Sequence, residues 1–192
     1  MSENAPVRWT QATVYADMWV DPDQDPRGNV APDGELPTLL YYLGHYRLTL
    51  GMKCEGLDAD QLARRSVPPS TLSLLGLVRH MARVEQSWGS RVLGGEPVQP
   101  VFSGDGEDPE FDGAIPDRTV VTEAFARWEE QMAGTDAAIA RFDDLGERVP
   151  LPRHGGQQVA VRDVLVHLIE EYARHCGHAD LLRECIDGRV GQ

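Results

Sequence analysis

Near the C-terminal end of the chain, a carboxylate and two histidines lie at helical spacing. Glu171, His175 and His178 follow one another at steps of four and three residues, and side chains at this spacing share one face of a helix. A carboxylate and imidazoles that converge inside a helix bundle are typical metal ligands. The segment therefore indicates a metal site, although surface polar residues beside a buried stripe would have the same spacing.

The helix that carries these residues is predicted over 161–187, with Gly188 ending it. Its apolar residues recur at three- and four-residue steps, the pattern of one buried stripe; they are Val161, Val164, Leu165, Leu168, Tyr172, Ala179, Leu182 and Ile186. His167 falls further round this helix, away from the stripe. We therefore expect His167 to be exposed.

Three further amphipathic helices are predicted from similar stripes. They span about residues 37 to 51–56, 72–93 and 121–142. No segment has a convincing strand pattern, and residues 150–156, rich in proline and glycine, are interpreted as a turn. Four amphipathic helices without strands predict an all-α protein with a four-helix bundle of residues 36–192 as its single domain.

Two segments outside these helices are irregular in sequence. Residues 1–35 are interpreted as an N-terminal arm, and its large apolar residues suggest that it packs on the domain: Trp9, Tyr15, Met18 and Trp19. Residues 94–118 are interpreted as a long acidic loop between the second and third helices. Because loops of this length are often functional, we expect this one to cover the site.

Composition narrows the class of function. The net charge of -13 and the pI near 4.8 disfavour binding to nucleic acids or anionic membranes. No apolar run has the length of a transmembrane helix and no signal peptide is recognisable, so we expect a cytoplasmic protein. Cys54, Cys176 and Cys185 form no paired framework and are interpreted as reduced thiols. Cys176, although adjacent to His175, is interpreted as structural.

The second helix offers a candidate ligand that would face the fourth. His80 lies toward one flank of its apolar stripe, and polar residues there need partners if they are buried. Three protein ligands leave one position of a metal open for water or substrate. Each imidazole should donate its second nitrogen to an acceptor, for which Glu85, Glu170 and Asp180 are available.

Several segments resemble motifs of the DinB-like superfamily. The run from His80 to Trp88, HMARVEQSW, resembles the second-helix motif, in which a histidine is followed by a glutamate and a tryptophan. The runs 167–188 and 69–78 are similar to an actinobacterial branch once known only as a domain of unknown function. Together these motifs extend the resemblance over nearly the whole chain.

The resemblance implies a four-helix bundle with one metal ligand from helix two and two from helix four. In many relatives a glycine lies two positions beyond the last ligand, and Gly177 has this relation to His175. The other ligand of helix four then falls on Glu171, as in the Glu-x-x-x-His version of mycothiol-dependent maleylpyruvate isomerase. The implied ligands are therefore His80, Glu171 and His175, with His178 as a replacement for, or addition to, Glu171.

The resemblance also implies a divalent metal and a thiol co-substrate. Zinc ranks first and nickel, iron and manganese are alternatives. Family relatives use the metal to lower the pKa of a low-molecular-weight thiol, so we expect a transferase that adds mycothiol to an electrophilic small molecule. His178 or Glu85 would act as base or orienting residue, and Arg83 or Arg174 would contact an anionic group of a substrate.

Other functions fit the same residues. One class comprises a thiol-dependent isomerase and a metal-dependent hydrolase that uses bound water. The other is non-catalytic, either a metal-binding stress protein or a bundle whose interface serves dimerisation. Homodimers are common for such bundles, so a homodimer is expected as well.

Overall fold

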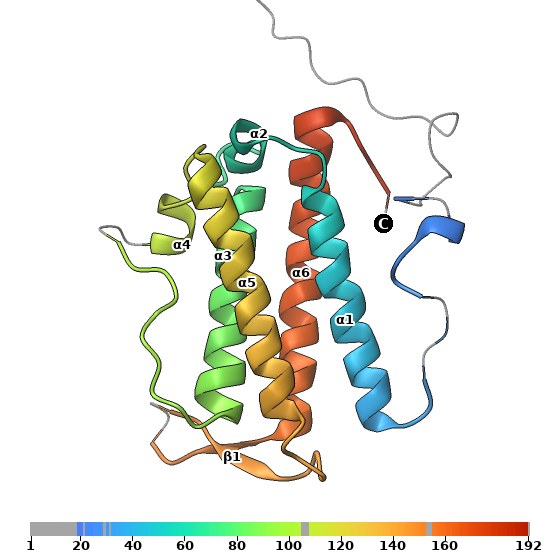
Figure 1. Cartoon of the computed structure of the whole chain (residues 1–192), viewed down its shortest axis with the longest axis vertical. Coiled ribbons are helices and arrows are strands. Elements are labelled where there is room, and N and C mark those ends of the chain that lie inside the picture. Colours follow the sequence, from blue (N-terminus) through green and yellow to red (C-terminus); the bar gives the residue numbers. More distant parts are fainter. Residues whose placement is uncertain are drawn as a thin grey trace, which may run out of the picture.

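The computed structural model describes residues 19–20, 22–28, 30, 32–104, 108–152 and 155–191. Within them, four long helical segments stand side by side (Figure 1). These are α1 (Glu35–Cys54), α3 (Leu74–Glu85) continued by the π-helix η2 (Gln86–Leu93), α5 (Arg118–Ile139) and α6 (Val161–Asp187). The prediction of an all-α bundle of four helices is thus confirmed.

Short elements connect these helices. They are the 3-10 turn η1 (Pro22–Gln24), α2 (Ala59–Ala63), α4 (Pro109–Asp112), β1 (Arg148–Pro150) and β2 (Gln158–Ala160). The prediction that the chain has no strand is wrong for β1 and β2, which pair antiparallel with Arg148 opposite Ala160. Three residues are too few for an alternating pattern to be visible, and Pro150 lacks a backbone N–H. The hairpin therefore has the sequence signature of a turn.

Capping residues mark the starts of α3 and α5 and the end of α6. The hydroxyl of Ser73 accepts a hydrogen bond of 3.1 Å from the backbone N–H of Gly76 and starts α3. The carboxylate of Asp117 caps α5 by accepting from the backbone N–H groups of Thr119 and Val120, just before the apolar stripe begins at Val121. Gly188 has a φ of 82°, a left-handed conformation that favours glycine, and ends α6.

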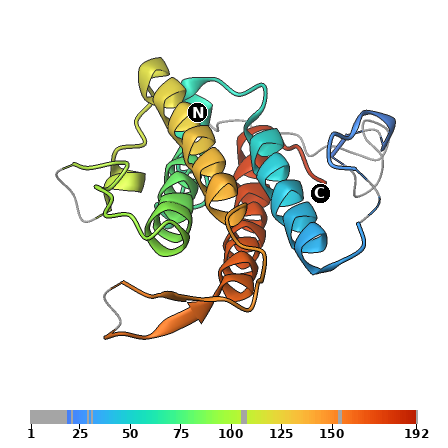
Figure 2. The same cartoon turned by 60° about the horizontal axis from the view of Figure 1, so that its bottom comes forward.

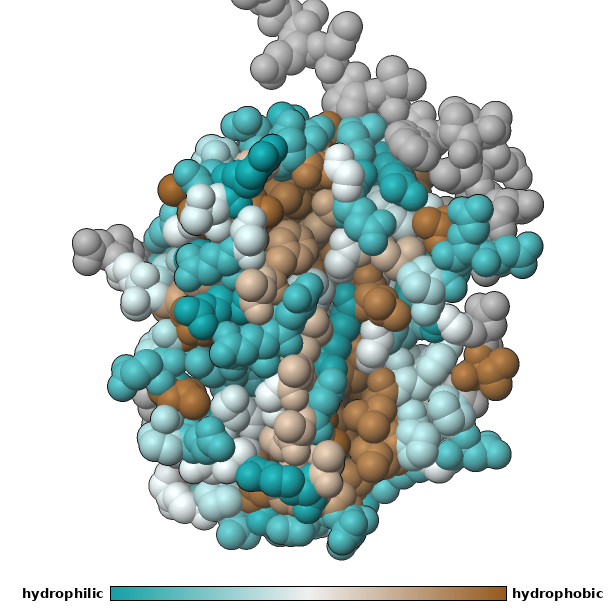
Figure 3. Space-filling model, viewed as in Figure 1, coloured by the Kyte–Doolittle hydropathy of each residue, from teal (hydrophilic) through white to brown (hydrophobic). Residues whose placement is uncertain are grey.

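α1 packs mainly on α6, and α3 packs on α5, so the two pairs form the walls of the bundle (Figures 1 and 2). The buried core includes Leu43 and Leu50 of α1, Leu77 and Met81 of α3, and Leu168 of α6. The face in Figure 3 is mostly hydrophilic, with a band of apolar residues along the line between α5 and α1. No helix in the described ranges is both long and apolar enough to cross a bilayer.

A buried polar network joins all four long helices. Arg47 of α1 donates hydrogen bonds of 2.8 and 2.9 Å to the two carboxylate oxygens of Glu85, at the end of α3. Tyr172 of α6 donates to Glu85 at 2.7 Å and accepts from Trp128 of α5 at 2.7 Å. Arg47 also donates to Asp136 of α5 at 2.7 Å. Because its members satisfy one another, the network fixes how the helices lie relative to each other.

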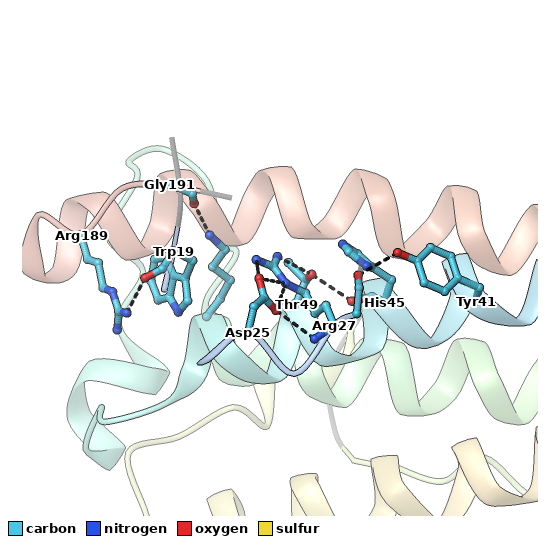
Figure 4. Close-up of polar contacts among 10 residues, drawn as sticks. Trp19, Asp25, Arg27, Tyr41, His45, Thr49, Arg189 and Gly191 are labelled. Carbon is cyan, nitrogen blue, oxygen red and sulfur yellow. Dashed lines mark hydrogen bonds and ion pairs between the residues drawn. The ribbon is translucent and has the colours of Figure 1, made fainter. Parts of the chain in front are cut away.

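The described part of the N-terminal arm lies against α1 and the C-terminal residues (Figure 4). Trp19 is buried, with the Lys53 ammonium 3.9 Å from its ring centroid and the Arg189 guanidinium 3.8 Å away. Arg189 also donates a hydrogen bond of 2.8 Å to the carbonyl of Trp19. The expectation that Trp19 packs on the domain is therefore confirmed.

A second attachment lies further along the arm. Arg27 donates to both carboxylate oxygens of Asp25, at 2.6 and 2.8 Å, and to the hydroxyl of Thr49 on α1 at 3.2 Å (Figure 4). Tyr41 of α1 donates to the carbonyl of Gly28 at 2.9 Å. The other apolar arm residues named above, Trp9, Tyr15 and Met18, lie outside the described residues. The division of the chain at residue 35 stays a prediction.

Candidate metal centre

α3 and α6 bring His80, Glu171 and His175 together. One donor atom from each side chain lies within 4.8 Å of the other two. Nε2 of His175 is 3.5 Å from Oε2 of Glu171, and the ring centroids of His80 and His175 are 4.7 Å apart. Around a tetrahedral zinc ion, ligand atoms lie about 3.4 Å apart. The group is therefore close to the spacing that such an ion requires, and its donor set of two imidazoles and one carboxylate suits it.

The environment of His175 keeps its imidazole neutral. Burial lowers the pKa of His175 to about 4, and the neighbouring His80, His178 and Arg174 act in the same direction. A neutral imidazole has a lone pair free at one nitrogen, and metal ions bind this form. Since α6 turns Nε2 of His175 toward Glu171, this nitrogen is the donor that the geometry makes available.

His178 lies behind His175 rather than within the group. The Nδ1 atoms of the two rings are 3.2 Å apart, so one ring donates a hydrogen bond to the other. Of the two residues that the sequence left open, Glu171 belongs to the converging group and His178 contacts it through His175. His178 therefore has the place of a residue that orients His175.

His167 is not exposed as the sequence predicted. Its ring is half-buried against Trp88, with 4.3 Å between the centroids, and its Nε2 is 3.3 Å from Oε1 of Glu171. The prediction was wrong because a helical stripe describes one helix alone, whereas Trp88 reaches His167 from the π-helix η2. The two oxygens of Glu171 thus face different histidines, His167 and His175.

The connection between η2 and α5 covers His80. Phe111 of α4 stacks on the His80 ring at 5.7 Å between centroids. Glu110, only 7% exposed, places Oε2 at 3.7 Å from Nδ1 of His80 and accepts a hydrogen bond of 2.6 Å from Arg83. Burial alone would raise the pKa of Glu110, but the nearby imidazole of His80 and the charge of Arg83 outweigh it and lower the pKa.

Sequence reasoning did not single out Glu110. A short helix start within the acidic loop is visible, because Pro109 suits a first helical position. The local pattern nevertheless contains nothing that pairs Glu110 with His80, which lies thirty residues earlier. Only the path of the connection across α3 brings the two together.

The acceptors expected for the imidazoles have other partners. Glu85 is fully buried, and both of its carboxylate oxygens accept hydrogen bonds in the network with Arg47. Glu170 accepts from Arg174 at 2.5 Å, and Asp180 pairs with Lys53 at 2.8 Å. Those acceptor assignments are therefore wrong. The structure does not bring Glu85 into the group around His80.

Arg83 belongs to α3 and Arg174 to α6, and each pairs with a glutamate. Arg83 contacts Glu110, and about half of each arginine side chain is exposed. The charge of Arg174 contributes to the lowered pKa of His175. Both guanidinium groups can therefore meet a ligand from solvent, and their role as substrate contacts stays a prediction.

The described cysteines are not activated thiols inside the bundle. Burial raises the pKa of Cys54 and of Cys176 to about 12. The Cys176 thiol donates to the carbonyl of Tyr46 at 3.6 Å, in agreement with a structural role. Cys185 is exposed on the last turns of α6. The packing of Cys54 and Cys176 therefore disfavours either thiol as a nucleophile.

Comparison with known proteins adds one finding. A family model described as Mycothiol-S-transferase matches residues 38–188. The matched range includes the three converging residues, Glu110 of the connection and His178. A search of curated proteins found no match.

Proposed function

Because the chain belongs to the mycothiol-S-transferase family, a DinB-like family, we propose that it adds mycothiol to an electrophilic small molecule in a metal-dependent reaction. The observation that carries this proposal is the convergence of His80, Glu171 and His175 within the range that the family covers. Their chemistry is that of an open three-ligand site.

In this proposal His80, Glu171 and His175 hold a divalent metal, with zinc ranked before nickel, iron and manganese. The cation supplies the charge that favours a thiolate over a thiol, and the thiolate is the nucleophile. His175 binds through Nε2, since its Nδ1 faces His178. Glu171 binds through one oxygen, since the other faces His167.

The remaining residues would orient the reactants. His175, held through Nε2, would carry its hydrogen on Nδ1 and donate it to Nδ1 of His178, so His178 would orient His175. The thiol proton would pass to solvent, a bond would form between the thiol sulfur and the electrophilic carbon, and the adduct would take up a proton from solvent. Arg83 and Arg174 would contact an anionic group of a substrate. Phe111 would exclude water from the His80 side.

Conjugation of mycothiol to a fluorogenic electrophile tests the proposal. We expect wild type to be active with zinc and the H80A, H175A and E171Q variants to lose at least about 100-fold in kcat/KM. Glu170→Gln is the matched control for Glu171, because Glu170 is an exposed neighbour whose carboxylate pairs with Arg174. Equal activity in all five proteins would refute the proposal.

Two other classes of function remain distinguishable by simple measurements. Turnover that needs no thiol would indicate a metal-dependent hydrolase, and turnover that needs thiol but returns it unchanged would indicate an isomerase. Tight binding of metal without turnover would indicate a metal-binding stress protein. A homodimer and a cytoplasmic location stay predictions from the sequence, and sedimentation of the purified protein tests the former.

A further inference from the structure

We infer that Glu110 is a positioning residue for His80, and that α4 is part of the metal site through this one carboxylate. The inference rests on the proposed metal site and extends it beyond the four long helices. It concerns how His80 is held, because a ligand that can rotate binds a metal less well than one that is fixed.

The side chain of Glu110 is buried and held by two specific contacts. A carboxylate whose side chain is only 9% exposed requires compensating partners, and here they are Nδ1 of His80 at 3.7 Å and the Arg83 guanidinium at 2.6 Å. With Nδ1 turned to Glu110, the Nε2 atom of His80 is the nitrogen left for Glu171 and His175. The carboxylate thus selects which nitrogen of His80 faces the group.

α4 is anchored to α3 independently of His80. The buried Arg79 guanidinium donates hydrogen bonds of 2.8 Å to the carbonyl of Glu110 and 3.0 Å to that of Pro109. It also lies 4.0 Å from the centroid of the Phe102 ring. Gly113 leaves room for this arginine, since a Cβ there would lie 2.4 Å from its Nη2 atom. The backbone that carries Glu110 is therefore held in place by α3 itself.

A carboxylate behind a ligating imidazole orients the ring, fixes its tautomer and makes it a better donor. Removing such a partner costs about 10- to 100-fold in metal affinity. Linkage adds a second consequence: if Glu110 strengthens metal binding, bound metal must strengthen the docking of α4 by the same factor. The second effect is measured without any turnover.

The experiment compares zinc binding to the full chain in wild type, E110Q and D112N, by competition with a chromophoric chelator. Asp112 is the matched control, because it is an exposed acid of the same short helix whose partners are Arg65 and the backbone N–H of Asp108. We expect E110Q to bind zinc 10- to 100-fold more weakly and D112N to bind within about twofold of wild type.

Amide hydrogen exchange over residues 108–114 gives the second readout. Zinc should slow exchange there in wild type and in D112N, and should slow it much less in E110Q. If E110Q does not fold, E110D replaces it, because it keeps the charge but withdraws the carboxylate from His80; its affinity should lie below that of wild type.

The outcomes separate this inference from the proposed function. Equal zinc affinity in wild type and the folded Glu110 variant, with the same zinc-dependent exchange, would overturn the role of Glu110 while the metal site stands. Wild type that binds no zinc and needs no metal for conjugation would overturn the metal site and the role of Glu110 together.

Discussion

The phenol of Tyr172 donates a hydrogen bond of 2.7 Å to the carboxylate of Glu85 at the centre of the bundle. Tyr172 is the chain neighbour of Glu171, and successive residues of a helix point about 100° apart. The bond that holds Tyr172 against α3 and α5 therefore also fixes the rotation at which α6 presents Glu171. Glu85 is thus linked to the candidate site through Tyr172, the chain neighbour of Glu171.

Replacing Glu85 by glutamine should destabilise the fold. The variant keeps the shape of the side chain but leaves Arg47, whose side chain is 11% exposed, with Asp136 as its remaining anionic partner. Loss of one partner of a buried ion pair costs about 3–5 kcal/mol, which corresponds to a fall in Tm of about 6–20 °C for a domain of this size. Thermal unfolding followed by circular dichroism measures it.

Asp136→Asn is the control for this prediction, since Asp136 binds the same arginine but is exposed. Its Tm should change by no more than about 4 °C. A Glu85→Gln variant with the Tm of wild type and no conjugating activity would instead support the catalytic role that the sequence suggested for Glu85.

Replacing His167 by alanine should weaken zinc binding by about tenfold. The variant frees Oε1 of Glu171, so this carboxylate is no longer fixed with one oxygen toward His175. Zinc competition measures the change, with His45→Ala as a control because His45 lies on α1 and packs against Tyr41 and Tyr46. If both histidine variants bind zinc as wild type does, the contact between His167 and Glu171 has no role in ligation.

The three cysteines should differ sharply toward a thiol-specific reagent. In the native protein, Cys185 should react within minutes at neutral pH, whereas Cys54 and Cys176 should not, because burial raises their pKa to about 12. Mass spectrometry should detect one modified cysteine in buffer and three in denaturant. Rapid native modification of Cys176 would contradict the described packing of α6 on α1.

The ion pair of the arm should make a contribution to stability that depends on pH. The side-chain hydrogen bond from Arg27 lowers the pKa of Asp25 below its ordinary value of 3.8. The unfolded chain therefore takes up a proton here at higher pH than the folded one. The stabilisation is fully present above about pH 4 to 5 and is lost as the pH falls through the lower, folded pKa.

Urea denaturation of wild type and Asp25→Asn at several pH values tests this sign. Wild type should be the more stable protein at pH 7, and the gap should narrow as the pH falls below 4. A gap that stays constant between pH 7 and pH 3 would mean that the charge of Asp25 does not contribute to stability through Arg27.

Apolar periodicity was sufficient to predict α6, for which 161–187 is both the expected and the observed range. Its stripe is long, and Gly188 supplies a clear end signal. Periodicity also located His80 on the helix that faces α6, because two stripes must be buried against each other. The spacing of four residues between Glu171 and His175 on α6 was then sufficient to predict the converging group.

The residues that contact this group could not be predicted from apolar periodicity. His167 was placed at the surface because a stripe contains no information on the indole of Trp88, which comes from another helix. Glu110 belongs to a connection whose sequence is acidic and irregular, so nothing marks one acid as buried. Glu85 is expected from the sequence to act as a base or an orienting residue, and its contact with Arg47 could not be foreseen, because Arg47 lies on another helix.

The two ends of the described chain meet at the indole of Trp19, which Arg189 contacts. A chain trimmed to the matched residues 38–188 would lose Trp19 and Arg189 together. The ammonium of Lys53, which is almost fully buried, would then face water where it now faces the Trp19 ring. The packed structure therefore extends past the residues that the family model matches, at both ends at once. Domain limits drawn from homology alone would cut through it.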